Sequence, residues 1–123
     1  MTRALLVVDD DPDVLEIIQL CLSAHADLAV TTAGGGAAAL ELFRAGGVDG
    51  LLLDVDMPGV DGRAVLAAVL AERPDLPVVF LTANTDDELV AELCTLGARA
   101  VLHKPFDPRR LGADVECAFG WAA

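Results

Sequence analysis

The side chains of this sequence that could take part in chemistry lie in four separate places, each at the end of a short apolar run. They are Asp9 and Asp10, Asp54, Thr82, and Lys104. Three carboxylates that lie close together repel one another unless a cation neutralises them. Mg²⁺ suits this role because it binds carboxylate, phosphate and water oxygens. A carboxylate nucleophile, a metal ion, a lysine ammonium and a threonine hydroxyl are together the components of phosphoryl transfer, which is the chemistry we expect.

Taken singly, each of these residues also has a purely structural explanation. Asp9 and Asp10 could belong to the loop before a helix, and Thr82 could simply end a strand. Lys104 could lie in a solvent-exposed turn. The prediction of a phosphoryl-transfer site therefore depends on whether the fold brings all of them to one place.

Apolar runs and helix-like patterns alternate along the chain, and this alternation predicts the fold. The predicted strands cover residues 4–8, 28–33, 51–54, 77–81 and 100–102. The predicted helices follow Asp11, cover residues 37–45 and 63–72, run from Thr85 to Leu96, and follow Asp107. We expect one α/β domain over residues 1–123, in which a parallel five-stranded sheet carries helices on both faces. Ligands bind at the carboxyl ends of the strands in such sheets, so the reactive residues would meet at one edge.

Three of the predicted helices have a recognisable start. Asp11-Pro12 and Asp107-Pro108 each combine an N-cap aspartate with a proline in the first turn. The segment Thr85-Asp86-Asp87-Glu88 has the spacing of a capping box, with Thr85 as the N-cap.

The acidic composition restricts the partners of the chain. The 123 residues carry a formal net charge of −12, and such a surface repels nucleic acid and anionic lipid. We therefore expect no direct binding to nucleic acid or to a membrane. The apolar residues near the N-terminus end at three aspartates without a cleavage site, and no run is long enough to cross a bilayer, which predicts a cytoplasmic protein.

Three well-separated cysteines lie in apolar helical patterns and are expected to be buried free thiols: Cys21, Cys94 and Cys117.

Four motifs give the sequence a resemblance to a known family. They are Val7-Val8-Asp9-Asp10-Asp11, the segment 51–62 with Asp54-Val55-Asp56-Met57-Pro58-Gly59 inside it, Leu81-Thr82-Ala83, and Lys104-Pro105-Phe106. Together and in this order they resemble the receiver domains of bacterial two-component response regulators. The resemblance covers nearly the whole chain.

The resemblance implies a doubly wound, flavodoxin-like fold of five β–α units with sheet order 2-1-3-4-5. It also implies that Asp54 is the phosphoacceptor and that Thr82 and Lys104 contact the phosphoryl group. The implied ligands of Mg²⁺ are Asp10 and Asp54 directly, Asp9 through water, and the backbone carbonyl of Asp56. The Lys104–Pro105 peptide bond is expected to be cis.

The resemblance further implies the kind of partner. The phosphoryl donor would be a phosphohistidine on a sensor histidine kinase or on a histidine phosphotransfer protein, and the downstream effector is not identified by the sequence. Such a domain is not an enzyme in the ordinary sense, because it only phosphorylates itself from a donor and slowly loses the phosphoryl group. The sequence leaves open whether the domain stands alone or belongs to a longer protein.

Two positions depart from the usual pattern of the family. Members usually carry Tyr or Phe three residues before the lysine, where this chain has Val101, and the chain has no Tyr at all. Asp56 places an acid two residues after the phosphoacceptor, where it could either face the site or point to solvent.

The sequence leaves two other functions open. The segment Asp54-Val55-Asp56 resembles the nucleophile motif of haloacid-dehalogenase-type phosphatases, although in that family the motif follows the first strand and here it follows the third. Catalytic turnover of a phosphoester would favour that family. A receiver-like interaction module that works without phosphorylation is the second possibility, and Val101 is the residue in its favour.

Overall fold

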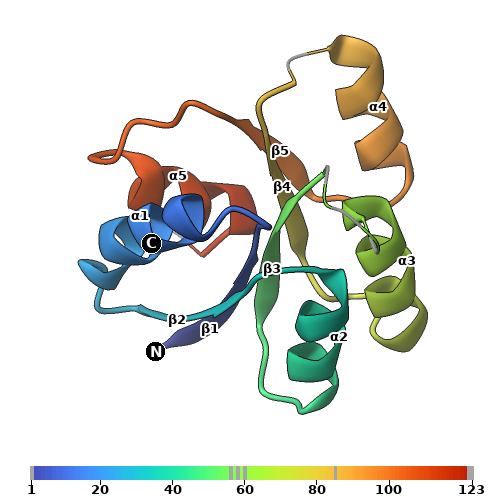
Figure 1. Ribbon diagram of the computed structural model, residues 1–123, viewed down its shortest axis with the longest axis horizontal. Coiled ribbons are helices and arrows are strands. Elements are labelled where there is room, and N and C mark those ends of the chain that lie inside the picture. Colours follow the sequence, from blue (N-terminus) through green and yellow to red (C-terminus); the bar gives the residue numbers. More distant parts are fainter. Residues whose placement is uncertain (1, 56, 58, 60, 85, 122–123) are drawn as a thin grey trace.

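Strands and helices alternate strictly along the chain (Figure 1). The computed structural model describes residues 2–55, 57, 59, 61–84 and 86–121. The strands are β1 (Arg3–Val8), β2 (Leu28–Ala33), β3 (Gly50–Asp54), β4 (Val78–Thr82) and β5 (Ala100–His103). The helices are α1 (Pro12–Ser23), α2 (Gly36–Arg44), α3 (Gly62–Glu72), α4 (Asp87–Thr95) and α5 (Leu111–Phe119).

The strands form one parallel sheet in the order β2-β1-β3-β4-β5, which confirms the predicted fold and sheet order. Strands β3 and β4 lie inside the sheet, and every residue of 50–53 and 78–82 is buried. Their uninterrupted apolar sequences follow from this position, because helices cover both faces of the sheet.

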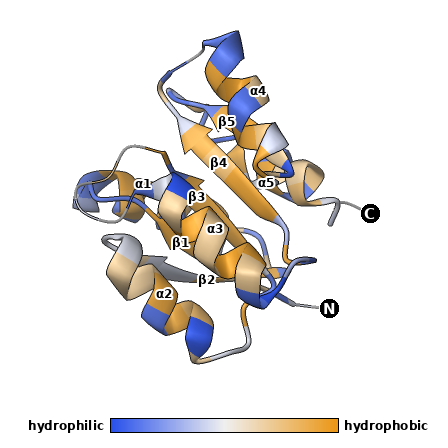
Figure 2. Cartoon of the chain, turned by 90° about the vertical axis from the view of Figure 1, so that its right-hand side faces the viewer, coloured by the Kyte–Doolittle hydropathy of each residue, from blue (hydrophilic) through white to orange (hydrophobic). Residues whose placement is uncertain are grey.

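The helices form two layers, with α1 and α5 on one face of the sheet and α2, α3 and α4 on the other (Figure 1). Successive residues of a strand point to opposite faces, so neighbours in sequence enter different cores. Leu53 and Phe80 pack with the α2–α4 layer, whereas Leu52 and Val79 pack with the layer of α1 and α5. Figure 2 shows the central strands as strongly hydrophobic and the outer surfaces of the helices as mixed.

The first residues of the helices can be compared with the predicted N-caps. Asp11 is the N-cap of α1, since its side chain accepts a hydrogen bond from the Asp13 N–H at 2.9 Å, and a proline follows in the first turn as predicted. The predicted cap of the last helix is wrong, because α5 begins only at Leu111. Asp107 instead accepts from the Arg109 N–H at 2.9 Å within a separate turn. Burial explains the later start, since the residues from 107 to 110 are exposed and Leu111 is the first buried one.

Helix α4 also begins later than predicted. Its N-cap is Asp86, whose side chain accepts from the Glu88 N–H at 3.0 Å. Thr85, the predicted cap, lies outside the described residues.

The cysteines are free, as predicted, but only partly buried. Cys21 is partly buried, whereas Cys94 and Cys117 are exposed, so the prediction of buried thiols is wrong for these two. The reason is that α4 turns its neighbour Leu93 toward the core, and α5 does the same with Val115 and Phe119. Within the described residues, none of the helices has the length and apolar character needed to cross a membrane.

Candidate functional site

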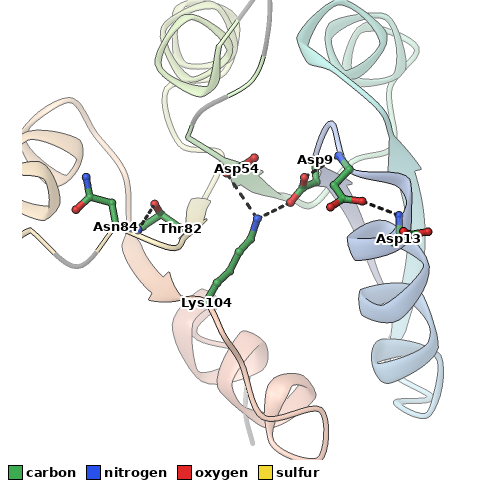
Figure 3. Close-up of polar contacts among 7 residues, drawn as sticks. Asp9, Asp13, Asp54, Thr82, Asn84 and Lys104 are labelled. Atoms are coloured by element: carbon green, nitrogen blue, oxygen red, sulfur yellow. Dashed lines mark hydrogen bonds and ion pairs between the residues drawn. The ribbon is translucent and has the colours of Figure 1, made fainter.

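The carboxyl ends of four strands meet where the sequence predicts a site. Asp9 follows β1, Asp54 ends β3, Thr82 ends β4, and Lys104 follows β5 (Figure 3). Backbone hydrogen bonds continue the pairing one residue beyond the ends of the strands, both between β1 and β2 and between β4 and β5. The Lys104 N–H donates to the Thr82 carbonyl at 2.7 Å, and the Asp9 N–H donates to the Ala33 carbonyl at 3.2 Å. The backbone therefore fixes the positions of these residues before their side chains make any contact.

Three carboxylates gather at this edge. One oxygen each of Asp9, Asp10 and Asp54 lies within 4.8 Å of the other two. Asp9 is buried, Asp54 is partly buried and Asp10 is exposed, so the cluster opens to solvent on the side of Asp10. Oxygen ligands of Mg²⁺ lie about 2.0–2.1 Å from the ion, and opposite ligands are therefore about 4 Å apart. The spacing of the three carboxylates fits a single small cation with oxygen ligands.

Lys104 lies between two of these carboxylates (Figure 3). Its ammonium Nζ is 2.7 Å from Asp9 Oδ2 and 3.8 Å from Asp54 Oδ1. The other oxygen of Asp9 accepts a hydrogen bond from the Asp11 N–H at 3.0 Å. Asp9 is 2% exposed, and a carboxylate buried to this degree needs such partners. Lys104 thus supplies the fixed positive charge that the sequence predicts there.

Thr82 closes the opposite side of the site. Its side chain is buried at 2% exposure, and its Oγ1 accepts a hydrogen bond from the Asn84 N–H at 3.1 Å. A hydroxyl that accepts a hydrogen bond keeps its own hydrogen for a second partner. Asn84 in turn accepts from the Asp86 N–H at 2.9 Å through its side-chain oxygen. Sequence reasoning gave Asn84 no role, since its contribution lies in a local turn that its residue type alone does not reveal.

Gly62 is a second residue whose role sequence reasoning missed. A Cβ atom at this position would lie 2.4 Å from the Asp54 carbonyl oxygen and 2.9 Å from the Phe80 ring. The Gly62 N–H donates to the Val55 carbonyl at 3.0 Å. Only glycine allows the start of α3 to approach the backbone of Asp54 this closely. The available signal was the glycine itself, at the predicted start of a helix.

The sequence also singles out the Lys104–Pro105 peptide bond, Val101 and Asp56. The Lys104–Pro105 peptide bond is cis, as predicted. Val101 lies opposite Phe80 on the neighbouring strand and is partly buried against the core of the α2–α4 layer. Asp56, predicted to bind the metal ion through its backbone carbonyl, lies outside the described residues.

Comparison with known proteins places this arrangement in a family. The DNA-binding transcriptional regulator NtrC of Escherichia coli K12 is 39% identical over 112 residues, which make up 91% of this chain and 24% of NtrC. Response regulator SaeR of Staphylococcus aureus USA300 is 35% identical over 107 residues, or 87% of this chain and 46% of SaeR. The chain thus spans less than half the length of these two relatives.

Solved structures show the same fold. The chemotaxis protein CheY4 of Vibrio cholerae matches with a TM-score of 0.89 and 28% identity, covering 96% of this chain and 99% of CheY4. The receiver domain of the Francisella response regulator 1452 matches with a TM-score of 0.87 and 27% identity, covering 97% of this chain and 98% of that domain. The sequence pattern of the response regulator receiver domain matches residues 5–116. The chain therefore belongs to the receiver domains of two-component response regulators.

Proposed function

We propose that this receiver domain accepts a phosphoryl group on Asp54 in a Mg²⁺-dependent reaction and changes conformation as a result. The observation that carries the proposal is the convergence of Asp9, Asp10 and Asp54 around one point, with the Lys104 ammonium beside two of them. This arrangement combines an acidic cation site with a carboxylate nucleophile and a fixed positive charge.

Each residue has a distinct role in the proposed reaction. An oxygen of Asp54 forms a bond to phosphorus while the bond from phosphorus to the imidazole nitrogen of a donor phosphohistidine breaks. Asp10 and Asp54 would hold the ion directly, Asp9 through water, and the backbone carbonyl of Asp56 would complete the protein ligands. Bound Mg²⁺ would neutralise charge on the phosphoryl oxygens. Lys104 and the Thr82 hydroxyl would then each bind one of these oxygens.

The proposed domain is a switch and not an enzyme. One phosphoryl group is held per chain, and it is lost slowly by hydrolysis without turnover of a separate phosphoester. The donor is a phosphohistidine of a sensor histidine kinase or of a histidine phosphotransfer protein, and we place the reaction in the cytoplasm with that donor. The output is the regulation of a downstream partner.

An apolar groove beside the site is a suitable surface for the donor protein to bind. The groove has a volume of about 330 Å³ and is lined by Val14, Ile17, Lys104, Pro105, Phe106 and Pro108. Ile17 is 47% exposed, which leaves an aliphatic side chain of α1 in contact with solvent. Arg109 follows the groove residue Pro108 in the sequence, and its side chain remains 93% exposed although its Nε lies 3.7 Å from Asp107 Oδ1. Because Lys104 belongs both to the groove and to the site, a protein seated there is next to Asp54. We propose that the donor protein binds here with an apolar helix that carries acidic residues toward Arg109.

A donor panel tests this docking surface. The panel consists of phosphorylated sensor-kinase domains, from which the fastest donor to the wild-type chain is chosen. Ile17→Ser should slow transfer from that donor by about tenfold, because an anchor in an apolar contact contributes about 1–2 kcal/mol. Leu42→Ser, which changes an exposed leucine on α2 in the other layer, is the matched control. Equal rates for both variants would exclude the groove as the docking surface.

Direct labelling tests the proposed function itself. The chain is incubated with acetyl phosphate and Mg²⁺, and the added phosphoryl group is located by mass spectrometry of peptides. Wild type should gain one phosphoryl group on the peptide that contains Asp54, and Asp54→Asn should gain none. Asp75→Asn, which changes an exposed aspartate outside the site, should label like wild type. Undiminished labelling of Asp54→Asn would overturn the assignment, and turnover of acetyl phosphate far beyond one equivalent would favour a phosphatase.

A further inference from the structure

Three hydrogen bonds in series connect the site to the start of α4. The Asn84 N–H donates to Thr82 Oγ1 at 3.1 Å, and the Asp86 N–H donates to Asn84 Oδ1 at 2.9 Å. The Glu88 N–H then donates to Asp86 Oδ1 at 3.0 Å. In each case a side chain accepts from the backbone two residues further along, and the residue that donates in one bond accepts in the next. We call this series the turn ladder.

The turn ladder leads from the interior to the surface. Thr82 is 2% exposed and lies at the site, while Asn84 and Asp86 are exposed. Asp86 is also the N-cap of α4, so the last bond of the ladder holds the first turn of that helix. Figure 3 shows the Thr82–Asn84 contact on the side of the site next to β4 and away from α1. A displacement of the Thr82 hydroxyl is therefore connected, through three bonds, to the end of a helix.

The rest of α4 is held weakly enough to respond. Leu93 is its only buried residue among those described, and Leu89 is partly buried against the same core. One ion pair joins α4 to α3, between Arg63 Nε and Glu92 Oε1 at 2.7 Å, and both side chains are at least 35% exposed. An exposed pair of this kind contributes little to stability.

We infer that Asn84 is a positioning residue that transmits the position of the Thr82 hydroxyl to α4. The inference rests on the proposed function, because the hydroxyl moves only when a phosphoryl group on Asp54 attracts it. When Thr82 Oγ1 moves, the Asn84 N–H that is bonded to it moves as well. The Asn84 side-chain oxygen then displaces the Asp86 N–H, to which it is hydrogen-bonded. Val101 has restricted χ1 and cannot fill the space that an aromatic side chain would, so the turn ladder is the connection from Thr82 to α4 that the hydrogen bonds of the described residues offer.

Amide chemical shifts test the role of Asn84. Spectra of the whole chain with Mg²⁺ are recorded with and without beryllofluoride, a mimic of the phosphoryl group. In wild type, amides at the site (residues 53–55 and 82) and in α4 (residues 88–95) should both change. In Asn84→Ala, changes at the site should remain, while those in α4 should fall to about a third, the size expected when one hydrogen bond of the series is lost. Asn84→Asp keeps an acceptor oxygen at the same position and should restore the α4 changes.

The outcomes separate the inference from the function on which it rests. If beryllofluoride leaves the site amides of wild type unchanged, the proposed function fails. If those amides change but the α4 response of Asn84→Ala equals that of wild type, the role of Asn84 is refuted. If Asn84→Asp behaves like Asn84→Ala, the side-chain acceptor is not what transmits the displacement, and the inference is also refuted. The spectra without beryllofluoride report whether α4 is intact in each variant.

Discussion

The two sides of the site differ in how firmly the fold holds them. The acidic side comes from β1 and β3, which lie inside the sheet, and residues 50–53 of β3 are all buried. The opposite side depends on β4, which also lies inside the sheet and is fully buried, and on β5, which forms an edge of the sheet. Residues 100–102 of β5 are only partly buried and His103 is exposed.

Because of this difference, we expect phosphoryl transfer and the conformational response to depend on different parts of the molecule. Phosphoryl transfer needs carboxylates held in fixed positions, because misplaced groups lose much of their effect on the rate. A conformational response needs a part of the fold that opens at low cost, where few apolar contacts are made. The acidic side has the first property, and the described residues between β4 and α4, which are exposed at positions 83, 84 and 86, have the second. Three comparisons between variants test this division, in order of decreasing expected effect.

The largest effect is expected from Gly62→Ala, which disturbs the firmly held side. The new methyl group would meet the Asp54 carbonyl oxygen, a backbone atom that cannot turn aside. We expect a loss of about 2 kcal/mol in the free energy of unfolding, or roughly 30-fold in the unfolding equilibrium, measured by urea denaturation. Gly34→Ala is the control, since a Cβ atom at Gly34 has nothing within 4 Å. Equal stability of both variants would show that the packing behind Asp54 is not tight.

A smaller effect is expected from Asp10→Ala on the binding of Mg²⁺. Removing one of three carboxylates removes a ligand and one negative charge, so the dissociation constant should rise by about tenfold. Isothermal titration calorimetry measures it directly, and Trp121 fluorescence is less suitable because that residue lies after α5, away from the carboxylate cluster. Asp13→Ala keeps the cluster but removes a nearby acid from the first turn of α1. If the two variants bind Mg²⁺ equally well, the carboxylates do not form the metal site.

The smallest effect is expected on the response of α4, from Thr82→Ala compared with Val101→Ala. Thr82→Ala removes the hydroxyl that begins the turn ladder, so the beryllofluoride-induced change in α4 amides should drop by about fourfold, or about 0.8 kcal/mol of coupling. Val101→Ala should leave most of the response, because the valine is too small to move between the surface and the interior. The comparison contradicts this mechanism if the valine variant loses the response and the threonine variant keeps it.

The sequence predicts the fold well because burial on both faces leaves a strong pattern. Runs such as Leu51-Leu52-Leu53 have no polar interruption, as is typical of an interior strand in a sheet that is covered on both faces. Strand order then places Asp9, Asp54, Thr82 and Lys104 at one edge without any knowledge of their side-chain contacts. The convergence of the site residues is thus a consequence of topology.

Local sequence motifs predict helix starts and side-chain exposure less well than the strand pattern predicts the fold. Asp-Pro starts α1 after Asp11, but after Asp107 the same pair forms a separate turn, because an aspartate can accept from the backbone in a turn as well as in a helix cap. The exposure of Cys94 and Cys117 depends on how each helix is rotated against the sheet, which apolar spacing alone fixes poorly. The role of Gly62 depends on a close approach between backbones that only the packed structure shows.

The ion pairs of Lys104 have a further consequence, which concerns the order in which ligands can bind. Among the described residues at the site, three carboxylates and one ammonium leave a formal charge of −2. A phosphorylated donor brings more negative charge and is repelled from such a site, while a divalent cation is attracted and balances it. A monovalent cation would leave half of the deficit in place. Under the proposed function, the charge of the site alone therefore favours a fixed order, in which the metal ion binds first and the phosphodonor then approaches a site whose charge has been neutralised.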